Sequence, residues 1–273
     1  VSLTFTTWGD LTPVFEKGIE DYKQVAPHVT VDLIEVPESY EQKMLTMIAG
    51  GTPPDVMLTL RFTFFNFLAK KVIINLQPYL DQRGFNKDDY FEIGIRPHTW
   101  KGNIYALPNE VGLWVVYYNK GIFDAEGVPY PKDDWTWEDL LATAKALTKR
   151  NAQGIAERFG FTVAYHGGGR LNCFPHQNGG KVVDDVTNPT KFMLHEPEGA
   201  EGIDFLASLM TVHKVAPSVQ EQKDLGGTGC LFKSGKMAMI YTDYAWTSDL
   251  RRDIKTFEWD VVEPARGKQK ATW

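Results

Sequence analysis

The chain has 273 residues and a net charge of −6, with 43% hydrophobic and 23% charged residues, a balance typical of folded globular proteins rather than disordered chains. The acidic balance and the lack of any Lys/Arg block argue against a nucleic-acid partner. No apolar run reaches the ~20 residues needed to span a bilayer.

Strand and helix patterns alternate over the first hundred residues. We expect strands at 3–7, 29–36 and 55–59. The segment 13–25 favours a helix whose apolar side carries Val14, Phe15, Ile19 and Tyr22. Ser39 and Gln42 suggest a capping box for the helix that ends at Gly50-Gly51, and a third helix is expected at 62–70. This alternation predicts a parallel α/β sheet.

The alternation stops at residues 98–119, which resemble a hairpin followed by an extended strand. It resumes with a helix opened by Thr136 and the acidic Asp139. Further helices are expected at 170–178 and 196–213, and strands at 159–163, 236–241 and 257–262.

These elements predict two α/β lobes, in line with the length of the chain. The first covers residues 1–109, the chain crosses over along 110–118, and the second lobe extends to 258. Residues 259–273 are expected to return to the first lobe, so that the two crossings form a hinge.

Ordered motifs along the whole chain resemble one known family. They include "LTFTTWGD", "YEQKMLTMIAGGTPPDVML", "KGNIYALP", "VVYYNKGIFDAEGVPYP", "WTWEDLLATAKALTK", "LFKSGKMAMIYTDYAW" and "FEWDVVEPARG". Together they are similar to the extracellular solute-binding proteins of bacterial ABC sugar importers, the maltose-binding-protein-like group. Members of this family usually continue for roughly another third, so the resemblance implies that this chain lacks that C-terminal part.

The resemblance implies a two-lobed fold of the periplasmic-binding-protein type II class, in which hinge strands join the lobes. It also implies a monomeric, non-catalytic receptor outside the cytoplasm, either periplasmic or lipid-anchored. Such a receptor captures a sugar in the cleft between the lobes and presents it to ABC permease subunits, without a cofactor. The start at Val1 suits an exported, processed chain or a shortened one.

Loops that follow strands are the candidate binding loops, because ligands of open α/β sheets bind at the carboxyl ends of strands. In the first lobe, Trp8 offers a flat ring for a sugar face, and Asp10 offers a charged hydroxyl acceptor. The alternatives are core packing for Trp8 and helix capping for Asp10. Glu38 and Tyr40 after the second strand, and Arg61 after the third, reach the ligand or lie on a solvated surface.

The crossing and the second lobe supply the other candidates. Asn109, Glu110 and Trp114 lie at the crossing, with core burial as the alternative for Trp114. Arg170 follows three glycines, and Gln177 has an amide that could bind hydroxyls or simply end a helix.

The resemblance places Tyr244 and Trp246 where the family uses aromatic rings for sugar stacking. Beside them Asp243 is a hydroxyl acceptor. The alternative is that Asp243 caps the start of the following helix and that one of the two aromatic rings is buried.

An enzyme is the competing interpretation, since paired carboxylates could act as in a glycosidase. Nothing in the sequence fixes two of them at a working separation, and no Ser-His-Asp order, HExxH or CxxC occurs. The six histidines show no metal-ligand spacing, so neither catalytic residues nor a metal are expected. Cys173 and Cys230 form a disulfide or remain two thiols.

Overall fold

The computed structural model describes residues 1–164, 172–186 and 189–271 and divides the chain into two units. Unit 1 is Val1–Val111 and unit 2 is Gly112–Trp273. The division falls two residues after the predicted boundary. No helix in the described ranges is long and apolar enough to cross a membrane.

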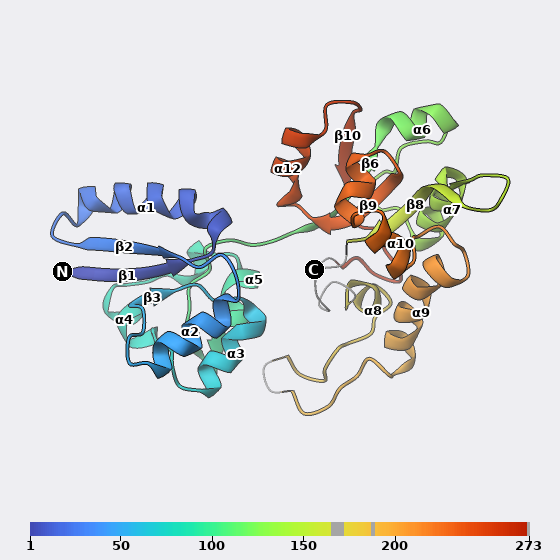
Figure 1. The fold of residues 1–273 in the computed structure, drawn as a ribbon. Coiled ribbons are helices and arrows are strands. Elements are labelled where there is room, and N and C mark those ends of the chain that lie inside the picture. Colours follow the sequence, from blue (N-terminus) through green and yellow to red (C-terminus); the bar gives the residue numbers. More distant parts are fainter. Residues whose placement is uncertain (165–171, 187–188, 272–273) are drawn as a thin grey trace. The chain divides into compact units, whose positions relative to one another are not determined.

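Unit 1 contains a three-stranded parallel sheet in the order β2-β1-β3, as the alternating pattern predicted. Its strands are β1 (Ser2–Thr7), β2 (Thr30–Glu35) and β3 (Val56–Met57). The connection from β1 to β2 and that from β2 to β3 run in opposite directions along the sheet. Right-handed crossovers therefore place α1 (Thr12–Val25) and α2 (Tyr40–Ala49) on opposite faces, as Figure 1 shows.

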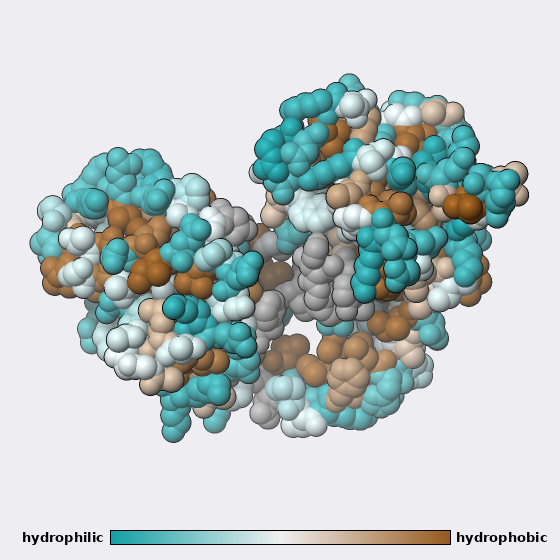
Figure 2. Space-filling view, in the orientation of Figure 1, coloured by the Kyte–Doolittle hydropathy of each residue, from teal (hydrophilic) through white to brown (hydrophobic). Residues whose placement is uncertain are grey.

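The predicted apolar side of α1 is only half covered. The ring of Phe15 packs edge-on against Phe5 at 4.7 Å, whereas Val14 and Tyr22 are 64% and 45% exposed. Figure 2 shows hydrophilic residues on the outer side of α1 and hydrophobic ones beneath it, over the strands. The pattern therefore located the helix correctly but overestimated its buried face.

The predicted capping box at Ser39 is not formed. Ser39 has a φ of 51° and its side chain makes no capping hydrogen bond to α2. A left-handed residue at this point directs the side chain away from the first turn, where an extended N-cap would reach the backbone N–H groups.

The remaining elements of unit 1 are short. They are η1 (Gly9–Leu11), α3 (Arg61–Ala69), α4 (Gln77–Gln82), η2 (Lys87–Asp89), α5 (Glu92–Ile95), η3 (Arg96–His98), β4 (Thr99–Trp100) and β5 (Asn103–Ile104). Strands β4 and β5 form the expected hairpin, whose turn has positive φ at Lys101 (49°) and Gly102 (78°).

Unit 2 is built on a five-stranded mixed sheet in the order β10-β6-β9-β8-β7. The strands are β6 (Trp114–Asn119), β7 (Lys149–Arg150), β8 (Ala156–Val163), β9 (Met237–Asp243) and β10 (Trp259–Val262). Strands β8 and β9 are parallel and every other pair is antiparallel. Side chains of β6 alternate between two hydrophobic cores, Trp114 and Val116 in one and Tyr117 in the other.

Helices cover both faces of this sheet. They are α6 (Lys120–Glu126), α7 (Trp137–Leu147), α8 (Cys173–Gln177), α9 (Pro197–Thr211), α10 (Val219–Asp224), α11 (Thr228–Lys233) and α12 (Trp246–Asp253). The predicted start of α7 is confirmed, because Thr136 and Asp139 form a reciprocal capping box.

The predicted return of residues 259–273 to the first lobe differs from the structure over the part described. Strand β10 pairs antiparallel with β6, from Trp259↔Asn119 to Val262↔Val116, which places it at an edge of the sheet of unit 2. The backbone then continues along the same unit, where Arg266 accepts a hydrogen bond from the N–H of Trp137. An open edge on β6 offered backbone partners that the strand pattern alone could not locate.

Candidate ligand-binding loops

In unit 1 the three parallel strands end at the same edge of the sheet, so the loops that follow them are neighbours. Trp8 directly follows β1 and is half-buried. Its ring meets that of Tyr40 edge-on, with centroids 5.1 Å apart and an interplanar angle of 82°. This contact fixes the plane of the indole while leaving part of it uncovered.

The hydroxyl of Tyr40 has three polar contacts inside unit 1. It accepts a hydrogen bond from the N–H of Leu58 (2.8 Å), donates one to the carbonyl of Thr6 (3.1 Å) and lies 2.7 Å from Oγ1 of Thr6. Its one proton and an acceptor position are therefore taken up by partners within the unit. Burial raises the pKa of this phenol above its usual value.

Glu35, the last residue of β2, is a member of this edge that the sequence analysis missed. Its Oε2 accepts a hydrogen bond from Oγ1 of Thr12 (2.7 Å), and a Cβ added to Gly9 would lie 3.2 Å from its Oε1. The carboxylate therefore lies against the loop that follows β1, yet Glu35 is exposed. An acidic residue at the end of the neighbouring strand was the available signal.

The other candidate residues of unit 1 are exposed at the surface or have side chains outside the described part of the chain. Glu38, Asn109 and Glu110 are exposed. Asp10 lies in η1 and Arg61 is the first residue of α3, but their side chains fall outside the described part of the chain.

In unit 2, the ends of β8 and β9 and the start of β6 share one edge of the sheet, because β6 runs antiparallel to β9 and Trp114 faces Asp243. Two hydrogen bonds hold the turn after β9. Oδ1 of Asp243 accepts from the N–H of Ala245 (2.8 Å), and the N–H of Tyr244 donates to the carbonyl of Leu113 (2.8 Å). The side chain of Tyr244 remains 48% exposed.

Tyr117 supports this turn from within the core. It is fully buried, and its hydroxyl lies 2.7 Å from Oγ1 of Thr247 and donates to the carbonyl of Tyr244 at 3.0 Å. Burial is the main cause that raises the pKa of Tyr117. The backbone that carries Tyr244 is thus held by a buried group while the Tyr244 ring points away from the core.

Trp246 begins α12 and is half-buried. It packs against the hydrophobic core of unit 2 that contains Tyr117, and a Cβ added to Gly229 would lie 3.3 Å from its ring. One side of the indole is therefore committed to packing. This arrangement combines the two interpretations that the sequence left open for Trp246.

Two candidates of unit 2 are core residues. Trp114 is 4% exposed and its ring meets Tyr241 edge-on at 5.2 Å, which favours the core alternative over a ligand contact. Gln177 is 1% exposed, accepts from the indole N–H of Trp137 (2.8 Å) and donates to the carbonyl of Ala271 (2.9 Å). Its amide is satisfied by the protein and serves packing. Arg170 lies outside the described residues.

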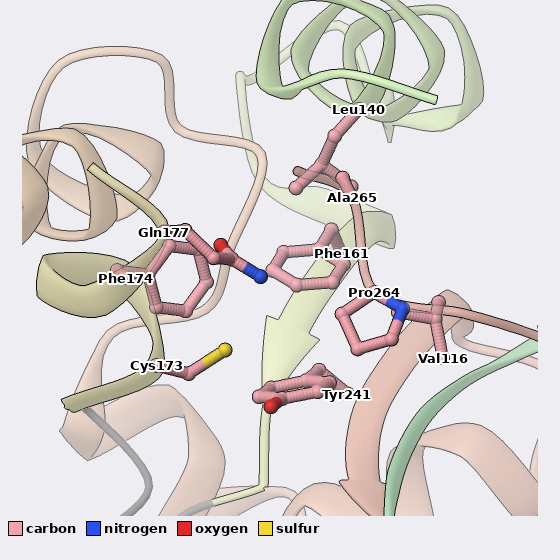
Figure 3. A pocket seen from close by; sticks show the side chains of 9 residues that line it. All are labelled: Val116, Leu140, Phe161, Cys173, Phe174, Gln177, Tyr241, Pro264 and Ala265. Carbon is pink, nitrogen blue, oxygen red and sulfur yellow. The ribbon is translucent and has the colours of Figure 1, made fainter. Parts of the chain in front are cut away.

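A small apolar cavity lies beside Gln177, within unit 2 (Figure 3). Its lining includes Phe161, Cys173, Phe174 and Tyr241, and it leaves only about 10 Å³ for the centre of a water-sized sphere. That is room for about one water molecule. The cavity is a packing gap and cannot hold a sugar ring.

Both cysteines are free thiols, Cys173 buried and Cys230 exposed. Among the residues that the structure describes, no group of three or more His, Cys, Asp or Glu is placed to hold a metal ion.

The sequence matches the family described as bacterial extracellular solute-binding protein over residues 8–267. Among curated proteins, the arabinooligosaccharide-binding protein of Halalkalibacterium halodurans is 26% identical over 219 residues, which are 78% of this chain and 47% of that protein. The arabinooligosaccharide-binding protein of Bacillus subtilis is 28% identical over 54% of this chain and 35% of its own length. The chain thus spans about half, or less, of the length of these relatives.

Solved structures agree in fold. An ABC substrate-binding protein from Listeria monocytogenes in complex with cycloalternan has a TM-score of 0.85 and 27% identity, over 99% of this chain and 68% of that one. A maltose-bound protein of T. maritima has a TM-score of 0.72 and 23% identity, over 99% of this chain and 69% of the other. The two-lobed sugar-binding fold expected from the sequence motifs is confirmed by these similarities.

Proposed function

The chain belongs to the family of bacterial extracellular solute-binding proteins, and we propose that it binds a carbohydrate through the strand-end loops of its two units and delivers it to an ABC permease. The arabinooligosaccharide-binding names of the curated relatives and the cycloalternan in the Listeria protein support an oligosaccharide as the ligand class. The protein acts outside the cytoplasm, free in the periplasm or anchored by lipid, and as a monomer.

The observation that carries this proposal is the pairing of an exposed aromatic ring with a carboxylate in one strand-end turn. Tyr244 is 48% exposed, and Asp243 beside it is half-buried. A sugar presents an apolar C–H face to a flat ring, and its hydroxyls donate to a carboxylate with charge-assisted strength. Trp8 and Glu35 offer the same two chemical groups at the strand ends of unit 1.

The ligand acts by shifting a population. A sugar that binds one conformation of the chain better than another shifts the population toward that conformation, and only this difference in affinity can drive the shift. The conformation that the ligand favours is then the state that the permease recognises. Catalysis has no part in this cycle, and the bound sugar leaves unchanged.

Titration with a panel of neutral and acidic oligosaccharides, followed by tryptophan fluorescence and calorimetry, tests the proposal. We expect one class, with arabinooligosaccharides and cycloalternan as the first candidates, to bind at micromolar concentration or below and to be recovered intact. Absence of binding across the panel, or recovery of shortened sugars, would contradict it.

A further inference from the structure

We propose that Tyr40 and Tyr117 are positioning residues for ligand binding, each fixing with its one hydroxyl the loops that carry the binding side chains of its unit. The inference rests on the proposed carbohydrate-binding function and deepens it. Neither phenol touches the ligand in this scheme. Each acts through the backbone of a strand-end loop.

In unit 1 the Tyr40 hydroxyl continues a strand pairing that ends early. Strands β1 and β3 pair only at Phe5↔Val56 and Thr6↔Met57. One residue further on, the N–H of Leu58 meets the Tyr40 oxygen at 2.8 Å, and the same oxygen bonds the carbonyl of Thr6. The phenol thus bridges the ends of β1 and β3, from which the loops at Trp8 and Arg61 start.

The ring of Tyr40 adds a second restraint in unit 1. It holds the indole of Trp8 edge-on at 5.1 Å, while Glu35 holds the other end of the same loop through Thr12. The backbone at Trp8 and the plane of its ring are therefore both fixed before any ligand arrives.

In unit 2 the Tyr117 hydroxyl holds the turn after β9 from beneath. Its partners are the carbonyl of Tyr244 (3.0 Å) and Oγ1 of Thr247 (2.7 Å), some 130 residues away along the chain. Thr247 is buried and its N–H also bonds the carbonyl of Tyr244. The ring of Tyr244 projects from a turn whose backbone is bonded on the core side.

Both hydroxyls lower the conformational entropy that is lost when the ligand binds. A loop that is already in its bound conformation loses less conformational freedom when the ligand arrives, and immobilising even one or two free side chains weakens binding by about tenfold. Loss of either hydroxyl should therefore reduce affinity although no ligand contact has been removed.

The test uses Tyr40→Phe and Tyr117→Phe, which keep each ring in place and remove only the oxygen. The matched control is Tyr130→Phe, because the Tyr130 hydroxyl also donates a hydrogen bond, at 2.6 Å to Asp124, but away from the strand-end loops. Calorimetry with the oligosaccharide that the unmodified chain binds gives the affinity. Hydrogen exchange at the amides of Leu58 and Thr247 reports loop fixing without any ligand, and urea unfolding reports stability.

We expect affinity to fall about tenfold in Tyr40→Phe and Tyr117→Phe, with faster exchange at Leu58 in the first and at Thr247 in the second, and no change of affinity in Tyr130→Phe. Lower stability with unchanged affinity would show a purely structural role and overturn the inference. Unchanged exchange would also overturn it. Failure of the unmodified chain to bind any carbohydrate would instead refute the proposed function, since exchange tests the loops independently.

Discussion

The indole nitrogen of Trp137 donates a hydrogen bond of 2.8 Å to Oε1 of Gln177 in the interior of unit 2. The other end of the amide donates to the carbonyl of Ala271, and the carbonyl of Gln177 accepts from the N–H of Gln269. One glutamine thus joins the start of α7 to the last described segment of the chain. Its role is to hold this segment on unit 2.

Replacing Gln177 by Leu leaves the Trp137 indole N–H without its partner in a buried site. We expect the free energy of unfolding to fall by about 1–3 kcal/mol, measured by urea unfolding, because an unsatisfied buried donor loses its hydration without compensation. Carbohydrate affinity should remain unchanged. Gln153→Leu, at an exposed position of the same unit, is the control. Loss of affinity with full stability would return Gln177 to the ligand contacts.

Gly160 marks the closest approach of β8 to α7. A Cβ added there would lie 2.0 Å from the carbonyl oxygen of Ala144, which is backbone and cannot rotate away. We expect Gly160→Ala to cost about 3 kcal/mol or more in unfolding free energy, or to prevent folding. Gly18→Ala is the control, because nothing lies within 4 Å of the added methyl and α1 should gain up to about 1 kcal/mol. Equal stability of the two variants would refute this packing.

The two cysteines should differ in reactivity. Burial raises the pKa of the Cys173 thiol to about 11, whereas Cys230 is exposed. The thiolate is the nucleophile, so iodoacetamide at pH 8 should label Cys230 in the folded protein and label Cys173 only after unfolding in urea, as read by mass spectrometry. Rapid labelling of Cys173 in the native protein would contradict its burial.

The same pKa shift has a consequence for stability. The folded-state pKa of Cys173 lies above that of an unfolded thiol, so the unfolded chain loses its proton first as the pH rises. The stability that the folded protein gains by burying the neutral thiol is fully present below pH ~8.5 and is lost as the pH rises from there to pH ~11. Urea midpoints across this range should fall less in Cys173→Ala than in the unmodified chain.

Local patterns predicted those parts of the fold that depend on neighbouring residues. Alternating strands and helices gave the parallel sheet of unit 1, and the Thr136–Asp139 spacing gave the start of α7. The place of β10 depended on an open edge of β6, more than 130 residues away, which no local pattern records. Ser39 failed as a cap because its backbone is left-handed, a property that serine does not signal.

The candidate binding loops were chosen by one rule, that ligands lie at the carboxyl ends of strands. The rule placed Trp8 and Tyr244 correctly at strand ends, and the structure leaves them half-buried and exposed, respectively. It could not tell that the Tyr40 hydroxyl is used by Leu58 and Thr6, or that Trp114 turns into the core. Those outcomes depend on which face of each element meets the rest of its unit, and that is decided by packing.

Trp246 should contribute to both binding and stability. Its ring packs against Gly229 and the hydrophobic core of unit 2 that contains Tyr117, and it lies at the start of α12, two residues after Tyr244. We expect Trp246→Ala to lower the unfolding free energy by about 1–3 kcal/mol and to weaken carbohydrate binding by tenfold or more. Urea unfolding and calorimetry measure the two effects. Unchanged affinity in a folded Trp246→Ala protein would remove this residue from the binding surface.

Truncation of Tyr244 should weaken binding with less effect on stability than truncation of Trp246. Its ring is 48% exposed, so truncation removes little packing, while its backbone contacts to Leu113 and Tyr117 remain. We expect Tyr244→Ala to weaken binding about tenfold, the loss of one stacking contact of about 1.4 kcal/mol, and to shift the urea midpoint hardly at all. Tyr22→Ala is the control, since this tyrosine is 45% exposed on α1. Equal affinity of the two variants would show that the exposed ring after β9 does not meet the sugar.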